Sequence, residues 1–229
     1  MKNTIYNITI KEHALHIIEK TLDMFLKVPA FQRYVNRRAN NKYGATFVTH
    51  PGNVTIDDVF TDYRFNDIQK DDIVLDIGAN IGAFSLFVSR MVKQVYAVEP
   101  MLSDVLKQNV SLNGRNNITV LNKALGEGIV EISWEGCKNR HIIGKSLSEL
   151  IFICGGRVDF LKCDCEGGEW CIKAEELGGI RRIEMEVHNF GGHDMNNFMK
   201  ILEDAGFEYD YNSPRNGIMF VHAFRRYFW

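Results

Sequence analysis

The stretch "VLDIGANIGAFSLFVSR" at residues 74–90 carries the pattern that decides the fold. An apolar run containing Asp76 leads into a loop with Gly78 and Gly82, after which an apolar pattern resumes. Glycine adopts backbone angles that a β-carbon would forbid, so such a loop can approach a ligand closely. The stretch therefore predicts a strand, a ligand-binding loop and a helix. The alternative interpretation of the loop is a simple turn.

Alternating strand and helix patterns continue from residue 71 and predict a parallel sheet covered by helices on both faces. The predicted strands are 73–78, 94–100, 118–125, 158–164 and 182–188. The predicted helices are 82–92, 102–112, 145–151, 168–177 and 194–205. Two further strands flank "SPRNG" (213–217) and predict an antiparallel hairpin at one side of the sheet.

Residues 1–70 differ in sequence pattern from the alternating strands and helices that begin at residue 71, and they predict an N-terminal extension. Their periodic apolar pattern predicts an amphipathic helix over about 12–27, and a Pro-Gly-Asn turn at 51–53 predicts a hairpin. This extension has too little apolar sequence to fold alone. We expect it to pack on the domain formed by residues 71–229 and to wall the acceptor side of the ligand pocket.

The composition of the 229-residue chain is that of a soluble globular protein, with 45% hydrophobic and 24% charged residues. A net charge of −2 gives no global attraction to nucleic acid or to an anionic membrane. The sequence shows no apolar run long enough to span a bilayer and no signal-peptide pattern. Five cysteines at irregular spacing do not suggest a disulfide framework. The expected location is the cytoplasm, without membrane contact.

The spacing of the glycines in the loop after the first strand distinguishes between two classes of cofactor. A nicotinamide dinucleotide site requires G-x-G-x-x-G, whereas this loop has G-x-x-x-G. Glu99 ends the next strand, where a carboxylate can accept hydrogen bonds from both hydroxyls of a ribose. An adenosine without a pyrophosphate indicates S-adenosylmethionine as the cofactor. Asp76 would then lie near the amino group of that cofactor or near an ordered water.

Several motifs together resemble one family. "VLDIGANIGAFS", "VYAVEP", "NKALGE", "DFLKCDCEGGEW" and "IEMEVHN" occur in this order within residues 45–190, and they resemble the FkbM family of S-adenosylmethionine-dependent methyltransferases. The resemblance implies a Rossmann-like class I methyltransferase fold, α/β, with a seven-stranded, mostly parallel sheet and an antiparallel C-terminal hairpin strand. It also implies O-methylation of a hydroxyl on a small molecule or sugar. One departure is that Cys163 and Cys165 occupy positions that are apolar in the family.

The cofactor should be held by the loops that follow the first three strands. The first loop would line its methionine part, the second would flank the ribose and adenine, and the third would reach the adenine edge, the last by analogy with the family. The predicted cofactor-binding residues are Asp76, Gly78, Ala79, Asn80, Gly82, Glu99, Pro100, Met101, Lys123, Ala124 and Asp164.

Three residues are predicted to act in catalysis. Asp164 falls at a strand end, where its carboxylate could orient the cofactor, bind a divalent metal or accept the acceptor's proton. His188 ends the neighbouring strand and could be the general base, or could only hydrogen-bond the acceptor. Glu186 could orient that imidazole or bind the acceptor itself. Cys163 and Cys165 lack the second half of a zinc site, so we expect core packing and no indicated metal.

Two rival functions remain open. An RNA methyltransferase could use the basic and aromatic patch formed by Arg33, Tyr34, Arg37, Arg38, Lys42 and Tyr43. The slightly acidic chain argues against this rival, and the absence of an Asn-Pro-Pro-Tyr motif argues against methylation of amino groups on bases. The second rival is a binding module that holds the cofactor without transferring its methyl group.

Overall fold

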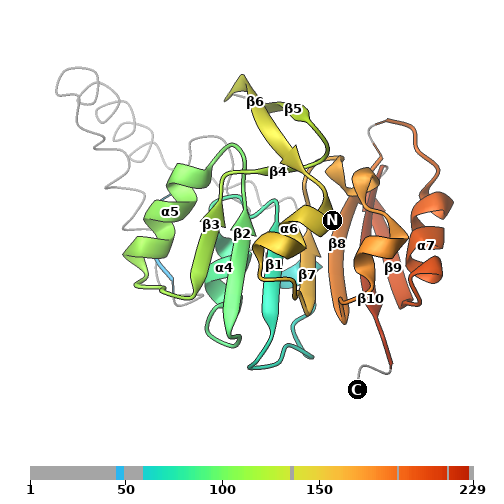
Figure 1. Ribbon diagram of the computed structural model, residues 1–229, viewed down its shortest axis with the longest axis horizontal. Helices are drawn as coiled ribbons and strands as arrows, with labels where there is room; N and C mark the ends of the chain where they lie inside the picture. Colours follow the sequence, from blue (N-terminus) through green and yellow to red (C-terminus); the bar gives the residue numbers. More distant parts are fainter. Residues whose placement is uncertain (1–44, 49–58, 135–136, 190, 216, 227–229) are drawn as a thin grey trace, which may run out of the picture.

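The computed structural model describes residues 45–48, 59–134, 137–189, 191–215 and 217–226. Its centre is a seven-stranded sheet in the order β3-β2-β1-β7-β8-β10-β9 (Figure 1). The strands are β3 (Ile118–Leu121), β2 (Gln94–Val98), β1 (Ile73–Ile77), β7 (Phe160–Cys163), β8 (Arg182–His188), β10 (Ile218–Phe224) and β9 (Glu208–Arg215). The first five are parallel, and β10 is antiparallel to both of its neighbours. This arrangement confirms the predicted fold class.

Helices cover both faces of the sheet, because alternate residues of each buried strand point to opposite sides. On one face, α4 (Ala83–Val88) and α5 (Ser103–Leu112) share a core with Val74 and Phe160. On the other face, α6 (Leu147–Ile153) and α7 (Met195–Asp204) share a core with Leu75 and Leu161. Ser146 and Glu149 form a capping box that starts α6.

A second, smaller sheet was not predicted. It has the order β4-β6-β5 and consists of β4 (Ala124–Leu125), β5 (Ile129–Trp134) and β6 (Cys137–Lys145). In Figure 1 the β5–β6 hairpin extends beyond the edge of the large sheet. The predicted strand 118–125 is therefore wrong as one element, since it ends as β3 at Leu121 and resumes as β4.

The predicted helix 168–177 is also wrong as one element. The chain forms two short 3₁₀ turns, η1 (Gly168–Cys171) and η2 (Ala174–Leu177). Ile172 and Lys173 between them are extended, with ψ of 135° and 148°. Ile172 lies in the core at 2% exposure.

The described parts of the predicted extension pack against the main domain. Val48 and Thr46 donate backbone N–H groups to the side-chain oxygens of Asn109 and Asn113, at the end of α5. The short helix α3 (Val59–Asp62) leads to Tyr63, whose ring packs edge-on against Phe84. The predicted helix 12–27, the turn at 51–53 and the basic patch lie outside the described residues, and the domain boundary at residue 70 stays a prediction. Within the described ranges, no helix is both long and apolar enough to cross a bilayer.

Candidate functional site

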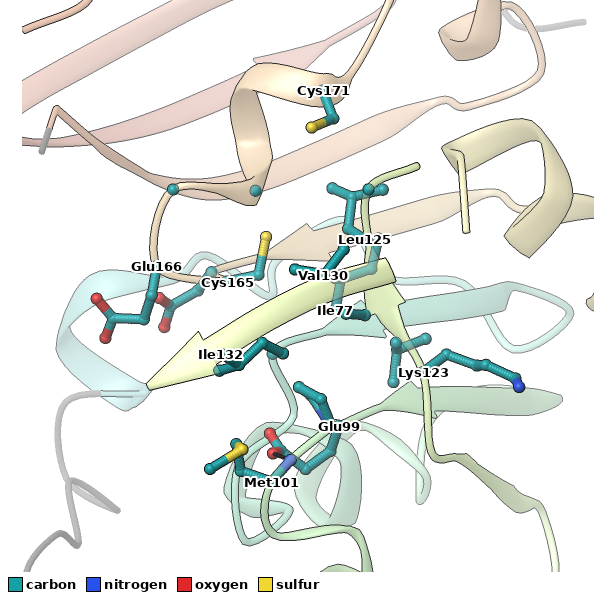
Figure 2. A pocket seen from close by; sticks show the side chains of 18 of the residues that line it. Ile77, Glu99, Met101, Lys123, Leu125, Val130, Ile132, Cys165, Glu166 and Cys171 are labelled. Carbon is teal, nitrogen blue, oxygen red and sulfur yellow. Dashed lines mark hydrogen bonds between the residues drawn. The ribbon is translucent and has the colours of Figure 1, made fainter. Parts of the chain in front are cut away.

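A cavity of about 610 Å³ lies at the carboxyl ends of β1 and β2. It is lined by the four loops that follow β1, β2, β3 and β7. Strand β5 supplies part of its wall, with Val130 and Ile132 among the lining side chains (Figure 2). Small-molecule sites have volumes of about 300–1,000 Å³, so the cavity has the size of a ligand pocket. Its remaining lining residues are Ile77, Gly78, Asn80, Val98, Glu99, Pro100, Met101, Leu102, Lys123, Ala124, Leu125, Gly126, Glu127, Ile129, Glu131, Asp164, Cys165, Glu166, Gly167, Gly168 and Cys171.

Gly78 is the position at which the loop after β1 meets the end of β7. Its φ is 75°, and a β-carbon added there would lie 1.6 Å from the backbone oxygen of Asp164. The N–H groups of Gly78 and Ala79 donate to the carbonyl of Val98 at 3.0 and 3.1 Å. Because these N–H groups are bonded to β2, they cannot bind a pyrophosphate as those of a dinucleotide-binding loop do. The geometry therefore disfavours a nicotinamide cofactor.

The other two predicted glycine-loop residues lie outside the cavity lining. Gly82 precedes α4 with a φ of 94°, and a β-carbon there would lie 2.5 Å from Cδ1 of Leu106 in α5. Ala79 is 4% exposed in the core beneath the loop. Gly82 thus allows α4 and α5 to pack closely, Ala79 belongs to the core, and the lining of the cavity from this loop comes from Gly78 and Asn80.

Glu99 joins the two loops that form the base of the cavity. Its Oε2 accepts the N–H of Asn80 at 2.9 Å, and its Oε1 accepts those of Met101 and Leu102 at 2.7 and 2.9 Å. Burial raises the pKa of the Glu99 carboxyl, and the three N–H donors oppose that rise. A carboxylate has about four lone-pair sites, so Oε2 keeps one for a ligand hydroxyl. Glu99 therefore links the two loops and keeps acceptor capacity for a ligand hydroxyl.

Asp76 and Lys162 form a buried ion pair beneath the glycine loop. They are direct neighbours in the register of β1 and β7, and Lys162 Nζ lies 3.4 Å from Asp76 Oδ1. Lys162 also donates to the carbonyl of Gly78 at 2.9 Å, while Ser85 donates to Asp76 Oδ2 at 2.6 Å. Burial opposes the charge on Lys162, but Asp76 and Asp164 outweigh it and raise its pKa. Asp76 is thus outside the cavity lining, and its place near the amino group of the cofactor or near an ordered water stays a prediction.

Asp164 connects this pair to the cavity. Its Oδ2 lies 3.7 Å from Lys162 Nζ and accepts the hydroxyl of Tyr63 at 3.0 Å. Burial raises the pKa of the Asp164 carboxyl, and the charge of Lys162 opposes that rise. Burial and the neighbouring Asp164 also raise the pKa of Tyr63 well above its ordinary value, so Tyr63 stays a donor. The side chain of Asp164 is 28% exposed and faces the cavity.

His188 lies among several carboxylates at the end of β8. Its Nε2 is 3.3 Å from Glu186 and 3.5 Å from Glu166, and its Nδ1 is 3.5 Å from Glu169. Burial favours the neutral imidazole, but Glu169 and Glu186 outweigh it and raise the pKa of His188 to about 10. The ring is therefore protonated at neutral pH, and in that state it cannot accept a proton. The general-base role stays a prediction that requires His188 first to lose this proton.

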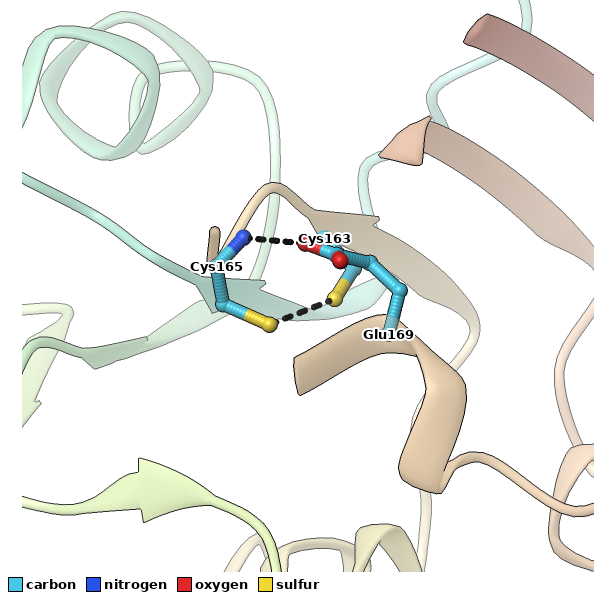
Figure 3. Close-up of side chains that lie close together, drawn as sticks. All are labelled: Cys163, Cys165 and Glu169. Atoms are coloured by element: carbon cyan, nitrogen blue, oxygen red, sulfur yellow. Dashed lines mark hydrogen bonds between the residues drawn. The ribbon is translucent and has the colours of Figure 1, made fainter. Parts of the chain in front are cut away.

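Cys163 and Cys165 lie on the other face of β7, and Figure 3 shows their sulfurs pointing toward each other. The two Sγ atoms are 3.6 Å apart. Burial raises the pKa of Cys163, and the adjacent Cys163 thiol raises that of Cys165, so both are thiols at neutral pH. Glu169 beside them accepts the N–H groups of Cys165 and Gly167 at 2.6 and 2.8 Å. Cys163 is a core residue, as the sequence predicted, whereas Cys165 reaches the cavity.

Most of the predicted site residues converge on one place. Those that line the cavity are Gly78, Asn80, Glu99, Pro100, Met101, Lys123, Ala124 and Asp164. Glu186 and His188 lie beside it, with their ligand atoms within 4.8 Å of one from Asp164. The sequence analysis missed the wall formed by β5. The β-branched residues Ile129, Val130 and Ile132 in "IVEISW" (129–134) were the available signal for this strand.

Comparison with solved structures supports the fold. A precorrin-8w decarboxylase from Methanobacterium thermoautotrophicum has a TM-score of 0.53 at 16% identity, covering 78% of this chain and 96% of that one. A precorrin-6y C5,15-methyltransferase from Geobacter metallireducens has a TM-score of 0.51 at 13% identity, covering 78% and 94%. With the strand order, these likenesses establish the class I methyltransferase fold. No protein-family model matches the chain, so the FkbM resemblance stays a prediction.

Similarity in sequence is confined to part of the chain. An uncharacterised RNA methyltransferase from Streptococcus agalactiae is 29% identical in an alignment 151 positions long that covers 53% of this chain and 33% of the relative. An uncharacterised protein from Methanocaldococcus jannaschii is 36% identical over 56 residues, which are 24% of this chain and 22% of that protein. The matched part thus spans a third or less of these relatives.

Proposed function

We propose that the chain is an S-adenosylmethionine-dependent methyltransferase that methylates a hydroxyl on a small molecule or sugar, as the resemblance to the FkbM family implies. The observation that carries the proposal is the cavity at the ends of β1 and β2, with Glu99 fixed at its base. The loop has no free N–H groups at Gly78 and Ala79 for a pyrophosphate. The class I fold and the name of the matched RNA methyltransferase support methyl transfer in general, and the hydroxyl acceptor rests on the resemblance alone.

The residues present fit this cofactor. Glu99 would accept a ribose hydroxyl, Met101 would lie against the adenosine, and Asp164 would face the positively charged methionine part. The cofactor, when bound, supplies an electrophilic methyl group. Transfer then depends mainly on alignment with the acceptor oxygen, to which a rigid site contributes most. Gly78 and Lys162 supply that rigidity, because they fix the end of β7 against the loop after β1.

The charges favour an uncharged acceptor over RNA. Asp164, Glu166 and Glu186 are grouped beside the cavity, and such a group repels phosphate. RNA methylation is the second candidate, and the names of the matched relatives favour it. Binding of RNA that weakens steeply as salt rises would support this second candidate.

The first test is calorimetric titration of the full chain with S-adenosylmethionine, its demethylated product and NAD. We expect binding of the two adenosyl ligands and none of NAD. Glu99→Gln should weaken that binding at least about tenfold, since the amide nitrogen cannot accept hydrogen bonds. Glu127→Gln is the matched control, because Glu127 also lines the cavity but is exposed and paired with Lys173. Binding of NAD alone would refute the proposal.

Unfolding curves must accompany this titration, because Glu99 also holds three backbone N–H groups. The acceptor class follows from transfer of a labelled methyl group. Hydroxylated small molecules and sugars should be labelled, and structured RNA should not. Labelling of RNA alone would move the proposal to its second candidate.

A further inference from the structure

The side chains at the ends of β7 and β8 form a group that the methyl-transfer proposal does not fully use. We propose that Asp164, Glu186 and His188 form a binding site for a divalent metal ion beside the cavity. The three residues each offer one ligand atom, and these atoms all lie within 4.8 Å of one another. Glu166 lies at the same place, with Oε2 3.5 Å from His188 Nε2.

The separations suit an ion with mixed nitrogen and oxygen ligands. Ligand atoms about 2.1–2.3 Å from an octahedral ion are about 3 Å from their neighbours. His188 Nε2 and Glu186 Oε1 are already 3.3 Å apart. Asp164 belongs to the same group within 4.8 Å, and Glu166 Oε2 lies 3.5 Å from His188 Nε2. Carboxylates with one imidazole are typical ligands of first-row divalent ions such as Mn²⁺.

The orientation of the imidazole is an independent observation. Glu169 is fully buried, is fixed by two backbone N–H groups, and lies 3.5 Å from His188 Nδ1. The opposite nitrogen, Nε2, is directed at Glu166 and Glu186. The contact with Glu169 is an ion pair at 3.5 Å without a hydrogen bond, so Glu169 places a negative charge behind the ring while Nε2 faces the other carboxylates. A metal-binding histidine has its second ring nitrogen next to a carboxylate in the same way.

The excess of carboxylates over cationic side chains in this group also favours binding of a cation. Among the described residues, the ion pairs of this group join five carboxylates, those of Asp76, Asp164, Glu166, Glu169 and Glu186, to only two cationic side chains. Lys162 is directed at Asp76 and the Gly78 carbonyl, so it neutralises mainly the far end of the group. A divalent ion bound by these carboxylates and by His188 Nε2 would reduce the repulsion among the carboxylates.

The site is reachable from the cavity, since Asp164 and Glu166 line it and their side chains are 28% and 67% exposed. An ion there would hold an acceptor hydroxyl near the transferable methyl group. This use of the ion rests on the proposed function, whereas ion binding itself does not.

The test is titration of the cofactor-free full chain with Mn²⁺, followed by electron paramagnetic resonance of the free ion. We expect one site, with affinity reduced at least about tenfold in Glu186→Gln and in His188→Gln. His193→Asn is the matched control, because this nearby exposed histidine stacks on Trp170 and lies outside the group. Absence of binding up to about 1 mM Mn²⁺ would overturn the proposal, as would equal binding by wild type and Glu186→Gln.

A second readout does not depend on variants folding. In the wild-type protein, Mn²⁺ should broaden the nuclear magnetic resonance signals of the His188 ring before those of His193. Broadening of His193 first would overturn the proposal. S-adenosylmethionine titration is measured separately, so failure of the metal site and failure of the proposed function give different results.

Discussion

Gly78→Ala is the substitution that most directly tests how the site is built. Gly78 has a φ of 75°, and an added β-carbon would lie 1.6 Å from the Asp164 backbone oxygen. Gly155, after α6, has a φ of 85° and no atom within 4 Å of an added β-carbon. The two positions therefore share the backbone strain and differ in the steric contact. Gly155→Ala is the matched control.

The expected magnitudes follow from these two contributions. A left-handed backbone at a non-glycine residue costs about 1–2 kcal/mol, and this applies to both variants. The contact with β7 adds about 1–3 kcal/mol of overpacking to Gly78→Ala alone, since a backbone oxygen cannot rotate away. The lower entropy of alanine in the unfolded chain affects both variants equally. Gly78→Ala should thus unfold about 1–3 kcal/mol more easily than Gly155→Ala.

Urea unfolding, followed by circular dichroism and tryptophan fluorescence, measures this difference directly. Titration with S-adenosylmethionine should also show weaker binding in Gly78→Ala, because Gly78 and Asp164 both line the cavity. A difference in unfolding free energy below about 0.5 kcal/mol would refute the reasoning. It would mean that the loop after β1 does not press against β7 as described.

Two further predictions concern buried charges. Lys162→Met should lower the unfolding free energy by about 3–5 kcal/mol, because Asp76 loses its charged partner in the core. Lys107→Met, at an exposed pair with Asp104, should cost less than about 1 kcal/mol in the same urea assay, and equal losses would contradict the argument. His188 contributes stability that is complete below its unfolded pKa of about 6.5 and is lost as pH rises toward its folded pKa of about 10. Stability measured from pH 6.5 to 9 should fall in wild type and fall less in His188→Gln. The cysteine thiols also lower stability as pH rises, because burial raises their pKa, but they are present in both proteins and their contribution is removed by the comparison. Parallel curves would show that His188 is not ion-paired.

The sequence predicted the central strands well because their burial on both faces makes them continuous apolar runs. A search for continuous apolar runs failed for β5 and β6, because this hairpin has some apolar side chains at the cavity and others exposed to solvent. Val130 and Ile132 of β5 face the cavity, whereas Ile129 and Ile143 are 74% and 59% exposed. Apolar side chains on both sides of a strand that is not buried obscure the alternation by which a strand is recognised.

The site residues likewise divide into those that the sequence predicts and those that it does not. Glu99 and Asp164 were predictable, because parallel strands bring their carboxyl ends to one edge of the sheet. The partner of Asp76 was not, because it depends on the register that sets Asp76 beside Lys162 across β1 and β7. The surroundings of His188 depend on the tight turn after β7, where Glu166 has a φ of 58°. That turn brings Glu166 and Glu169 next to His188. Of the three carboxylates around His188, only Glu186 is close to it in the sequence.

The metal site and the acceptor class are linked through charge. Without an ion, the group of carboxylates at Asp164, Glu166 and Glu186 repels a phosphate within a Debye length of about 8 Å. A bound divalent ion reverses this effect locally, and an anionic acceptor then becomes compatible with the same residues. The preference for an uncharged acceptor therefore holds for the ion-free protein alone. For this reason the Mn²⁺ titration should precede the screen of acceptors, and RNA should be tested both with the ion and with a chelator. Labelling of RNA only when the ion is present would assign the charge reversal, rather than a basic patch, as the cause of RNA recognition.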